Sequence, residues 1–394
     1  MDSQSEDNET TGSWWRPGDG EPRVSERVRY AVVGLGATAQ GAILPAFAHA
    51  RSNSELVALV SGDAEKLQLL GRKYRIKNLY DYHGYEDCLA SGDIDAVYVA
   101  LPNNQHREFT VRAARAGIHV LCEMPMAVDA EECEAMRAAC RATNVKLMIG
   151  YRLHFEEANL RAIQLARSGR LGDLRTFHSS FAMPASPTPT LGGTLRFDGE
   201  VSGGPLLDLG IYCIHAARHF FESEPVDVAA ISMRGKRDSR FADGEETVSA
   251  ILRFPGDRVA TFTSSRRATD ASYFELHGTE GFLRLEQAYS YSKPMLLRAS
   301  VKGRTRDKAF RKRDQFAPEL QYFSECVLDG SEPEPSGLQG ANDIRIVEAI
   351  RRAARSGQVT PVDVAPDLTT ALSPREMSMG ARTDGFAHVA GPQV

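Results

Sequence analysis

The segment that most constrains this chain is Tyr30–Ala39, an apolar strand followed by the pattern G-x-G-x-x-A and the start of a helix. In such a segment Gly34 allows a tight turn, Gly36 lets the backbone approach a pyrophosphate, and Ala39 lets the helix pack closely on its strand. The helix start at Ala37-Thr38 offers free N–H groups and the positive end of the helix dipole, which favour phosphate. The pattern therefore predicts a dinucleotide cofactor at this turn.

A regular alternation of strands and helices follows this motif. Continuous apolar strands separated by amphipathic helices are typical of a parallel sheet with helices on both faces. The pattern predicts strands at Val28–Val33, Leu56–Val60, Ala96–Ala100, His119–Cys122 and Lys146–Ile149, and helices that begin near Ala39 or cover Ala64–Lys73, His106–Ala116 and Ala130–Ala142. We therefore expect a doubly wound Rossmann domain over residues 27–150, with the cofactor across the carboxyl ends of the strands.

The pattern changes after Tyr151. Short strand-like runs joined by turns predict a mostly antiparallel sheet, with helices before and after it. The expected strands are Val226–Met233, Glu246–Phe254, Arg258–Ser265, Ser272–His277 and Phe282–Gln287, and the expected helices are Arg161–Ser168, Leu206–Phe221, Pro318–Leu328 and Asp343–Ser356. Residues 151–363 are thus expected to form a second α/β domain for substrate binding and oligomerisation. An open sheet covered by helices on one face leaves the other face for a partner.

Charge and composition exclude several classes of protein. The net charge of -5 is carried by residues 1–26, a polar segment expected to be a disordered arm, and residues 364–394 are expected to be a loosely ordered tail. The remaining chain is balanced, so we expect no nucleic-acid partner, and the basic run Lys302–Arg313 is predicted to be a solvated loop. No apolar run is long enough to cross a membrane. The six cysteines form no C-x-x-C pair, which favours reduced thiols in the cytoplasm and no metal site.

Several longer motifs carry a family resemblance. The runs YAVVGLG, IDAVYVALPNNQH, HVLCEMPMA, KLMIGYRLHF and LLDLGIY lie in a stretch from Tyr30 to Val362. This stretch resembles the glucose–fructose oxidoreductase, inositol dehydrogenase and rhizopine-catabolism family (Gfo/Idh/MocA), and within it glucose–fructose oxidoreductase most of all. The resemblance implies a Rossmann domain, a second domain with a large open sheet that pairs in dimers or tetramers, and hydride transfer between a nicotinamide cofactor and a sugar or polyol.

The residues that distinguish NAD from NADP follow the second predicted strand. An NAD enzyme usually places Asp or Glu there to bind the ribose 2′-hydroxyl. Here the strand ends in Ser61-Gly62, and Lys66 follows one turn into the helix, so a hydroxyl, free N–H groups and an ammonium group are available for a 2′-phosphate. This favours NADP. Because the carboxylate of Asp63 could repel that phosphate, NAD remains the alternative.

The resemblance assigns further residues to the nicotinamide end of the cofactor. The turn Leu101-Pro102-Asn103, with His106, matches the family's contact with the nicotinamide ribose. Arg152 and Arg196 match family arginines near the substrate or cofactor. The alternative for His106 is a helix-start histidine with a local hydrogen bond.

The main departure from the family is at Glu123-Met124-Pro125, where the family has E-K-P. The family's lysine lies at the reacting carbon, whereas the thioether of Met124 has no proton to give and no charge. Methionine copies the length of a lysine stem, so Glu123 and Met124 are still expected at the cofactor pocket. The alternative function is a catalytically silent or impaired dinucleotide-binding protein.

The remaining catalytic candidates are Asp208, Tyr212 and His215. Their spacing of i, i+4 and i+7 predicts one face of a helix. The resemblance implies that Tyr212 is the proton donor and acceptor at the sugar hydroxyl, with Asp208 as its orienting or substrate-binding neighbour. His215 is either a proton relay or a helix histidine satisfied by local bonds.

Overall fold

The first sheet is parallel and six-stranded, with the strand order β3-β2-β1-β4-β5-β6. Its strands are β1 (Val28–Val33), β2 (Ser54–Val60), β3 (Asn78–Tyr80), β4 (Ala96–Val99), β5 (His119–Glu123) and β6 (Leu147–Gly150). The computed structural model describes residues 27–184, 204–234 and 245–365. The order reverses direction between β1 and β4, so a crevice opens there at the carboxyl ends of the strands. The predicted Rossmann sheet is confirmed.

Five α-helices in the described part of the chain accompany this sheet. They are α1 (Leu44–Ala46), α2 (Ala64–Tyr74), α3 (Tyr85–Ala90), α4 (His106–Arg115) and α5 (Ala130–Ala142). Of these, α2, α4 and α5 begin where the sequence predicts. Asp129 caps α5, because its carboxylate accepts a hydrogen bond from the N–H of Glu132 at 2.8 Å. The sequence analysis missed β3 and α3, which are only three and six residues long.

The second sheet is nine-stranded, with the order β14-β13-β12-β11-β7-β10-β9-β8-β15. Its strands are β7 (Leu174–Ala182), β8 (Asp227–Arg234), β9 (Glu245–Phe254), β10 (Arg258–Ser265), β11 (Ala271–Gly278), β12 (Gly281–Glu286), β13 (Met295–Val301), β14 (Arg304–Phe310) and β15 (Thr360–Pro361). The expected open, mostly antiparallel sheet is confirmed. β10 and β11 are not neighbours, however, because β7 lies between them, parallel to β10 and antiparallel to β11.

The basic run was wrongly predicted to be a loop. Residues Met295–Phe310 form the hairpin β13–β14 at one edge of the second sheet. The side chains of β14 are exposed up to Ala309, which explains why the run lacks the apolar alternation of a half-buried strand. Charged side chains on an edge strand discourage pairing with another chain.

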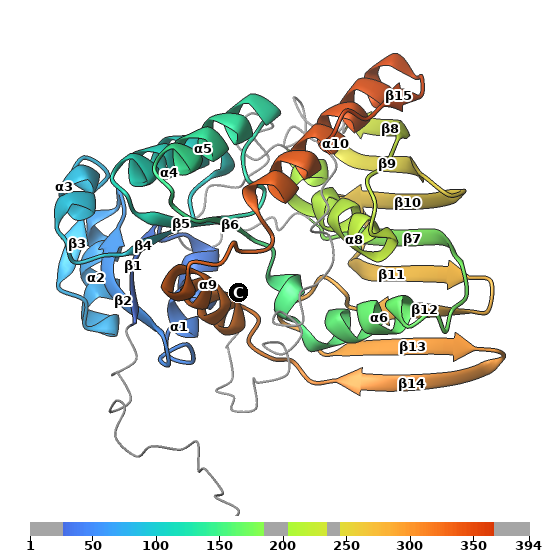
Figure 1. The fold of residues 1–394 in the computed structure, drawn as a ribbon, viewed down its shortest axis with the longest axis horizontal. Coiled ribbons are helices and arrows are strands. Elements are labelled where there is room, and N and C mark those ends of the chain that lie inside the picture. The colour runs from blue at the N-terminus through green and yellow to red at the C-terminus, as the bar shows by residue number, and fades with distance from the viewer. Residues whose placement is uncertain (1–26, 185–203, 235–244, 366–394) are drawn as a thin grey trace, which may run out of the picture.

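The remaining described α-helices are α6 (Glu157–Arg167), α8 (Ile211–Phe221), α9 (Phe316–Asp329) and α10 (Gly337–Ser356). Helices α6 and α8 lie along the second sheet, α9 lies against the first sheet, and α10 contacts both (Figure 1). Helix α9 packs its apolar face against β1 and β2 of the first sheet, where Phe323 and Leu320 are completely buried. A segment late in the sequence therefore completes the core of the first domain. None of the helices in the described ranges is long and apolar enough to cross a membrane.

Candidate active site

The turn after β1 has the shape that a pyrophosphate requires. Gly34 has φ +94°, and a Cβ at this residue would lie 2.5 Å from the carbonyl oxygen of Ala100, so only glycine fits. Above Gly36 the space is open, since a Cβ there would meet nothing within 4 Å. Ala37 and Thr38 are exposed, whereas Ala39 is buried at the start of a π-helical turn, Ala39–Ile43. The turn therefore presents its backbone to a ligand, and the residues fit a dinucleotide.

The end of β2 is built around a paired carboxylate. Asp63 caps α2 by accepting a hydrogen bond from the N–H of Lys66 at 3.0 Å, and its other oxygen lies 3.1 Å from the Lys66 ammonium group. Gly62 lies under the ring of Tyr82, where a Cβ would come within 2.9 Å of the ring. The buried hydroxyl of Ser61 accepts a hydrogen bond from the N–H of Asp63. The negative charge of Asp63 is thus already balanced by Lys66.

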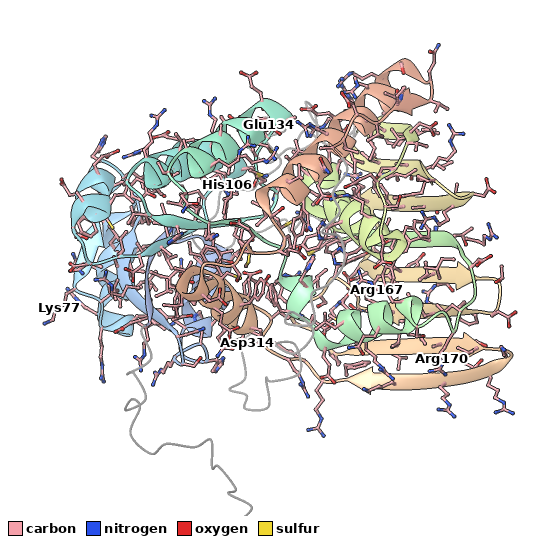
Figure 2. All side chains as sticks on the ribbon, viewed as in Figure 1. Lys77, His106, Glu134, Arg167, Arg170 and Asp314 are labelled. Carbon is pink, nitrogen blue, oxygen red and sulfur yellow. The ribbon has the colours of Figure 1, made fainter. Side chains whose placement is uncertain are left out.

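His106 holds two loops together rather than lining an open surface. Its ring is completely buried, with Nε2 2.9 Å from the carbonyl oxygen of Leu101 and Nδ1 3.0 Å from that of Pro125 (Figure 2). The turn with Pro102 and the buried Asn103 follows β4 and leads directly into α4. His106 therefore fixes the loop after β4 relative to the loop after β5, which contains Met124.

Tyr212 lies on α8 against the guanidinium group of Arg152. The carbon of that group is 5.4 Å from the centre of the Tyr212 ring. Arg152 is buried after β6, and it donates hydrogen bonds to the side chain of Gln315 and, at 2.8 Å, to the carbonyl oxygen of Tyr289. Burial raises the pKa of Tyr212, and the positive charge of Arg152 acts in the opposite direction. The structure thus pairs the predicted proton donor with a fixed cation.

Two carboxyl groups share one hydroxyl beside this pair. The hydroxyl of Tyr98, on β4, is 2.8 Å from Glu123 Oε1 and 2.9 Å from Glu319 Oε1. A phenol has one proton and can donate to only one of them, so one carboxyl must be protonated and donate in return. Burial raises the pKa of Glu123 to about 7, while Tyr98 and Arg152 oppose this shift. Burial and the charge of Glu123 raise the pKa of Glu319 well above its usual value.

Tyr98 and Glu319 were missed in the sequence. Glu319 precedes the apolar Leu320 and lies four residues before Phe323 on α9, so a charged residue falls on the buried face of a helix. That position is costly without a partner and could have been noticed. Nothing in the local pattern indicates that the partner is Glu123.

The three residues predicted to share a helix face have different partners. Leu206–Gly210 forms a π-helical turn before α8, which changes the rotation between Asp208 and Tyr212. Asp208 forms an ion pair with Arg266 at 3.0 Å. His215 Nδ1 lies 2.7 Å from a carboxylate oxygen of Asp343. The predicted Arg196 lies outside the described residues.

Comparison with known proteins gives matches along most of the chain. Residues 28–151 match a family model described as an oxidoreductase family with an NAD-binding Rossmann fold (GFO_IDH_MocA), and residues 159–284 match the GFO/IDH/MocA C-terminal domain. The chain is 32% identical over 339 residues to a D-xylose 1-dehydrogenase [NADP(+)] of Haloarcula marismortui, which covers 85% of this chain and 93% of that relative.

Solved structures match over similar lengths. An aldose-aldose oxidoreductase from Caulobacter crescentus, complexed with glycerol, has a TM-score of 0.81 and 38% identity and covers 85% of this chain and 100% of its own. A 3-ketoreductase from Actinomadura kijaniata, in complex with NADP and TDP-benzene, has a TM-score of 0.75 and 26% identity. The match covers 83% of this chain and 98% of the ketoreductase chain.

Proposed function

We propose that this chain, which belongs to the Gfo/Idh/MocA oxidoreductase family, is an NADP(H)-dependent oxidoreductase of sugars or related polyols. The relatives named above act on xylose, on aldoses or on a keto group, and two of their names include NADP. The observation that carries the proposal is the placement of Tyr212 against Arg152, in a chain whose strand β1 leads into a tight glycine turn with the shape that a pyrophosphate requires.

In the proposed reaction NADP supplies the hydride acceptor, and the chain handles the proton. In the oxidation direction Tyr212 in its ionised form would take the proton of the sugar hydroxyl whose carbon gives up the hydride, and the phenol would be protonated as the carbonyl forms. The reverse reaction returns hydride and proton. The fixed charge of Arg152 stabilises the ionised phenol, because the guanidinium group cannot itself lose a proton at neutral pH. Asp208 is held in place by its ion pair with Arg266 and is proposed to orient the substrate.

Met124 sets the limit on the expected rate. In the structure it packs against the apolar core beside Glu123, and its thioether cannot move a proton. A positioned acid or base typically contributes about 10²–10⁴-fold to a rate. We therefore propose slow turnover by Tyr212 alone, and the second candidate function is a dinucleotide-binding protein without turnover.

The preference for NADP is proposed from Ser61, Gly62 and Lys66. The Asp63 carboxylate is engaged by Lys66 and by the backbone of α2, so its repulsion of a 2′-phosphate is reduced. The Lys66 side chain is partly exposed, and its ammonium group is proposed to bind such a phosphate. The affinity for NAD is expected to be lower, because the ribose hydroxyl finds no free carboxylate.

The test of function is kinetic. Reduced-nicotinamide absorbance is followed with a panel of aldoses, ketoses and polyols in the parent, Tyr212→Phe, Met124→Lys and the matched control Tyr74→Phe, which lies on α2. Turnover in the parent that only Tyr212→Phe abolishes supports the enzyme. Tight NADPH binding without turnover, rescued by Met124→Lys, supports the silent protein. No nucleotide binding by calorimetry would exclude both.

We also propose that the chain forms a homodimer or homotetramer through the second sheet. Ile231, Met233 and Ile251 are more than half exposed and lie on one face of the paired strands β8 and β9. Large apolar side chains clustered on a sheet face favour association. Light scattering should show a smaller assembly for Ile231→Lys than for the parent. The proposed location is the cytoplasm, where the six buried thiols stay reduced.

A further inference from the structure

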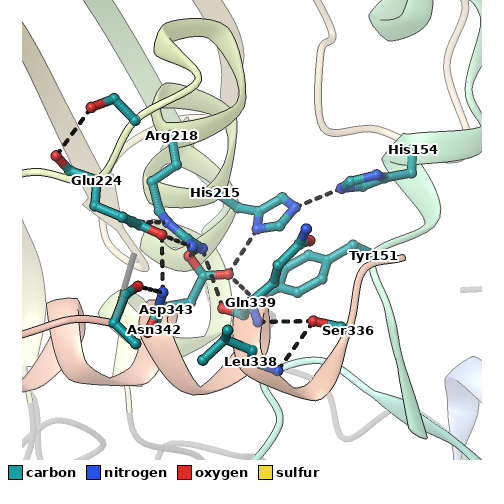
Figure 3. Close-up of polar contacts among 12 residues, drawn as sticks. Tyr151, His154, His215, Arg218, Glu224, Ser336, Leu338, Gln339, Asn342 and Asp343 are labelled. Carbon is teal, nitrogen blue, oxygen red and sulfur yellow. Dashed lines mark hydrogen bonds and ion pairs between the residues drawn. The ribbon is translucent and has the colours of Figure 1, made fainter. Parts of the chain in front are cut away.

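Three buried histidines lie together at a place that the proposed hydride transfer does not use. His215 and His219 are one turn apart on α8, and His154 comes from the turn after β6. Their exposed fractions are 7%, 5% and 3%. One ring nitrogen from each residue lies within 4.8 Å of the other two, and Figure 3 shows His154 and His215 facing each other. Two histidines at i and i+4 on a helix are a frequent part of zinc sites.

The orientation of His215 is fixed by a carboxylate. Its Nδ1 lies 2.7 Å from Asp343 Oδ2, so Nδ1–H donates to Asp343 and Nε2 keeps a lone pair (Figure 3). The ring of Tyr151 stacks on His215 with centres 3.8 Å apart, and the Tyr151 hydroxyl also donates to Asp343. A histidine whose second nitrogen donates to a carboxylate is the usual arrangement of a metal ligand.

The lone pair of His215 has an unusually close neighbour. Its Nε2 is 2.6 Å from His154 Nε2, so without an ion the two nitrogens share one proton in a short hydrogen bond. The Nε2 of His219 is buried and accepts or donates no hydrogen bond within the described parts of the chain. A buried nitrogen of this kind calls for an explanation, and an ion is one.

The surrounding charges permit a cation. Arg167 and Arg218 are positive charges that act on His154 and His219, and Arg218 is paired with Asp343 at 2.6 Å and with Glu224 at 2.5 Å. Two carboxylates and one guanidinium group leave one net negative charge beside the three rings. Arg167, on α6, is likewise paired with Glu222.

We propose that His154, His215 and His219 bind one divalent transition-metal ion, and zinc is the ion used here for comparison. Imidazole nitrogens suit zinc, copper, iron and nickel. Zinc–nitrogen bonds of about 2.0–2.1 Å in a tetrahedron place two nitrogens about 3.3 Å apart. The close His154–His215 pair would therefore open by less than 1 Å, which small side-chain rotations supply. With three protein ligands the fourth position is left for water.

The first experiment needs no variant. Protein made without a histidine tag is stripped with a chelator, dialysed and titrated with zinc and with cobalt. We expect one equivalent to bind, visible absorption bands of tetrahedral cobalt that zinc abolishes, and a higher unfolding temperature in the loaded protein. Cobalt without these bands, or stripped and loaded proteins that unfold at the same temperature, would overturn the proposal and leave a hydrogen-bonded cluster of core histidines.

The second experiment locates the site. In His219→Gln no hydrogen bond at Nε2 is lost, so the metal-free protein should keep the circular dichroism of the parent. Its zinc affinity should fall by more than the roughly 10–100-fold that loss of a supporting group alone causes. The zinc affinity of His154→Gln should fall by a similar factor. The matched control is His178→Gln, an exposed histidine on β7. Equal zinc affinity in His178→Gln and His219→Gln would also overturn the proposal.

These readouts use neither nucleotide nor sugar. Cobalt binding without sugar turnover would support the metal site and contradict the proposed function. Sugar turnover without cobalt binding would support the proposed function and contradict the metal site.

Discussion

The carboxyl pair Glu123 and Glu319 makes the stability of the protein depend on pH. The Tyr98 hydroxyl has one proton for two carboxyl oxygens, so the folded protein carries a second, carboxyl proton. In the unfolded chain both groups have pKa values near 4.5. Arg152 faces both carboxyls and favours their ionised forms, and Asp314 faces Glu319 and favours its protonated form.

The direction of these pKa shifts decides whether stability rises or falls with pH. The folded pKa is raised, so the proton is bound in the folded state at pH values where the unfolded state has lost it. Below pH 4.5 both states are protonated and the pair contributes nothing. The pKa of Glu123 is about 7 in the folded protein. Between pH 4.5 and this value the free energy of unfolding falls by about 1.4 kcal/mol per pH unit. For Glu123 alone this costs about 3 kcal/mol at pH 7, and the raised pKa of Glu319 adds a further cost of the same sign.

Glu319→Gln should reduce this cost. The side chain is completely buried, and the amide N–H can donate to the Tyr98 oxygen as the protonated acid does. We expect the free energy of unfolding to rise at pH 7 and to change little at pH 4.5, so that stability falls less steeply with pH than in the parent. Urea denaturation from pH 4.5 to 8, followed by fluorescence and circular dichroism, measures both effects.

The matched control is Glu55→Gln, an exposed carboxyl on β2. It should keep the pH slope of the parent. A Glu319→Gln protein with the parent's pH slope, or one less stable than the parent at pH 7, would refute the idea of a shared proton.

Three further predictions concern other parts of the chain. Gly34→Ala should abolish nucleotide binding and cost at least about 1–3 kcal/mol, because φ +94° and the nearby Ala100 oxygen both oppose a Cβ; calorimetry showing unchanged affinity would contradict this. Lys66→Ala should weaken NADP binding about tenfold and leave NAD binding unchanged; an equal loss for both nucleotides would remove Lys66 from the 2′-phosphate site. Arg218→Met should destabilise the protein by about 3–5 kcal/mol in urea, since it leaves the Asp343 carboxylate buried without its cation; a loss under 1 kcal/mol would be inconsistent with that burial.

The sequence was sufficient for features that are encoded locally. The apolar strand, the glycine turn and the helix starts of the first domain are patterns of a few residues, and they predicted the parallel sheet and its tight turn correctly. The tight turn at Gly34 needed no tertiary contact to be predicted. The capping of α5 by Asp129 is also local, because donor and acceptor are three residues apart.

Only the tertiary structure decided which distant residues meet. Helix α9 folds back onto the first sheet, and this brings Glu319 to Tyr98 across 221 residues of sequence. The spacing of His215 and His219 is visible in the sequence, but His154 joins them from another element, 61 residues before His215. The insertion of β7 between β10 and β11 is of the same kind. Hydrophobic periodicity reports which face of an element is buried, whereas the partner buried against that face is chosen by the packing of the whole chain.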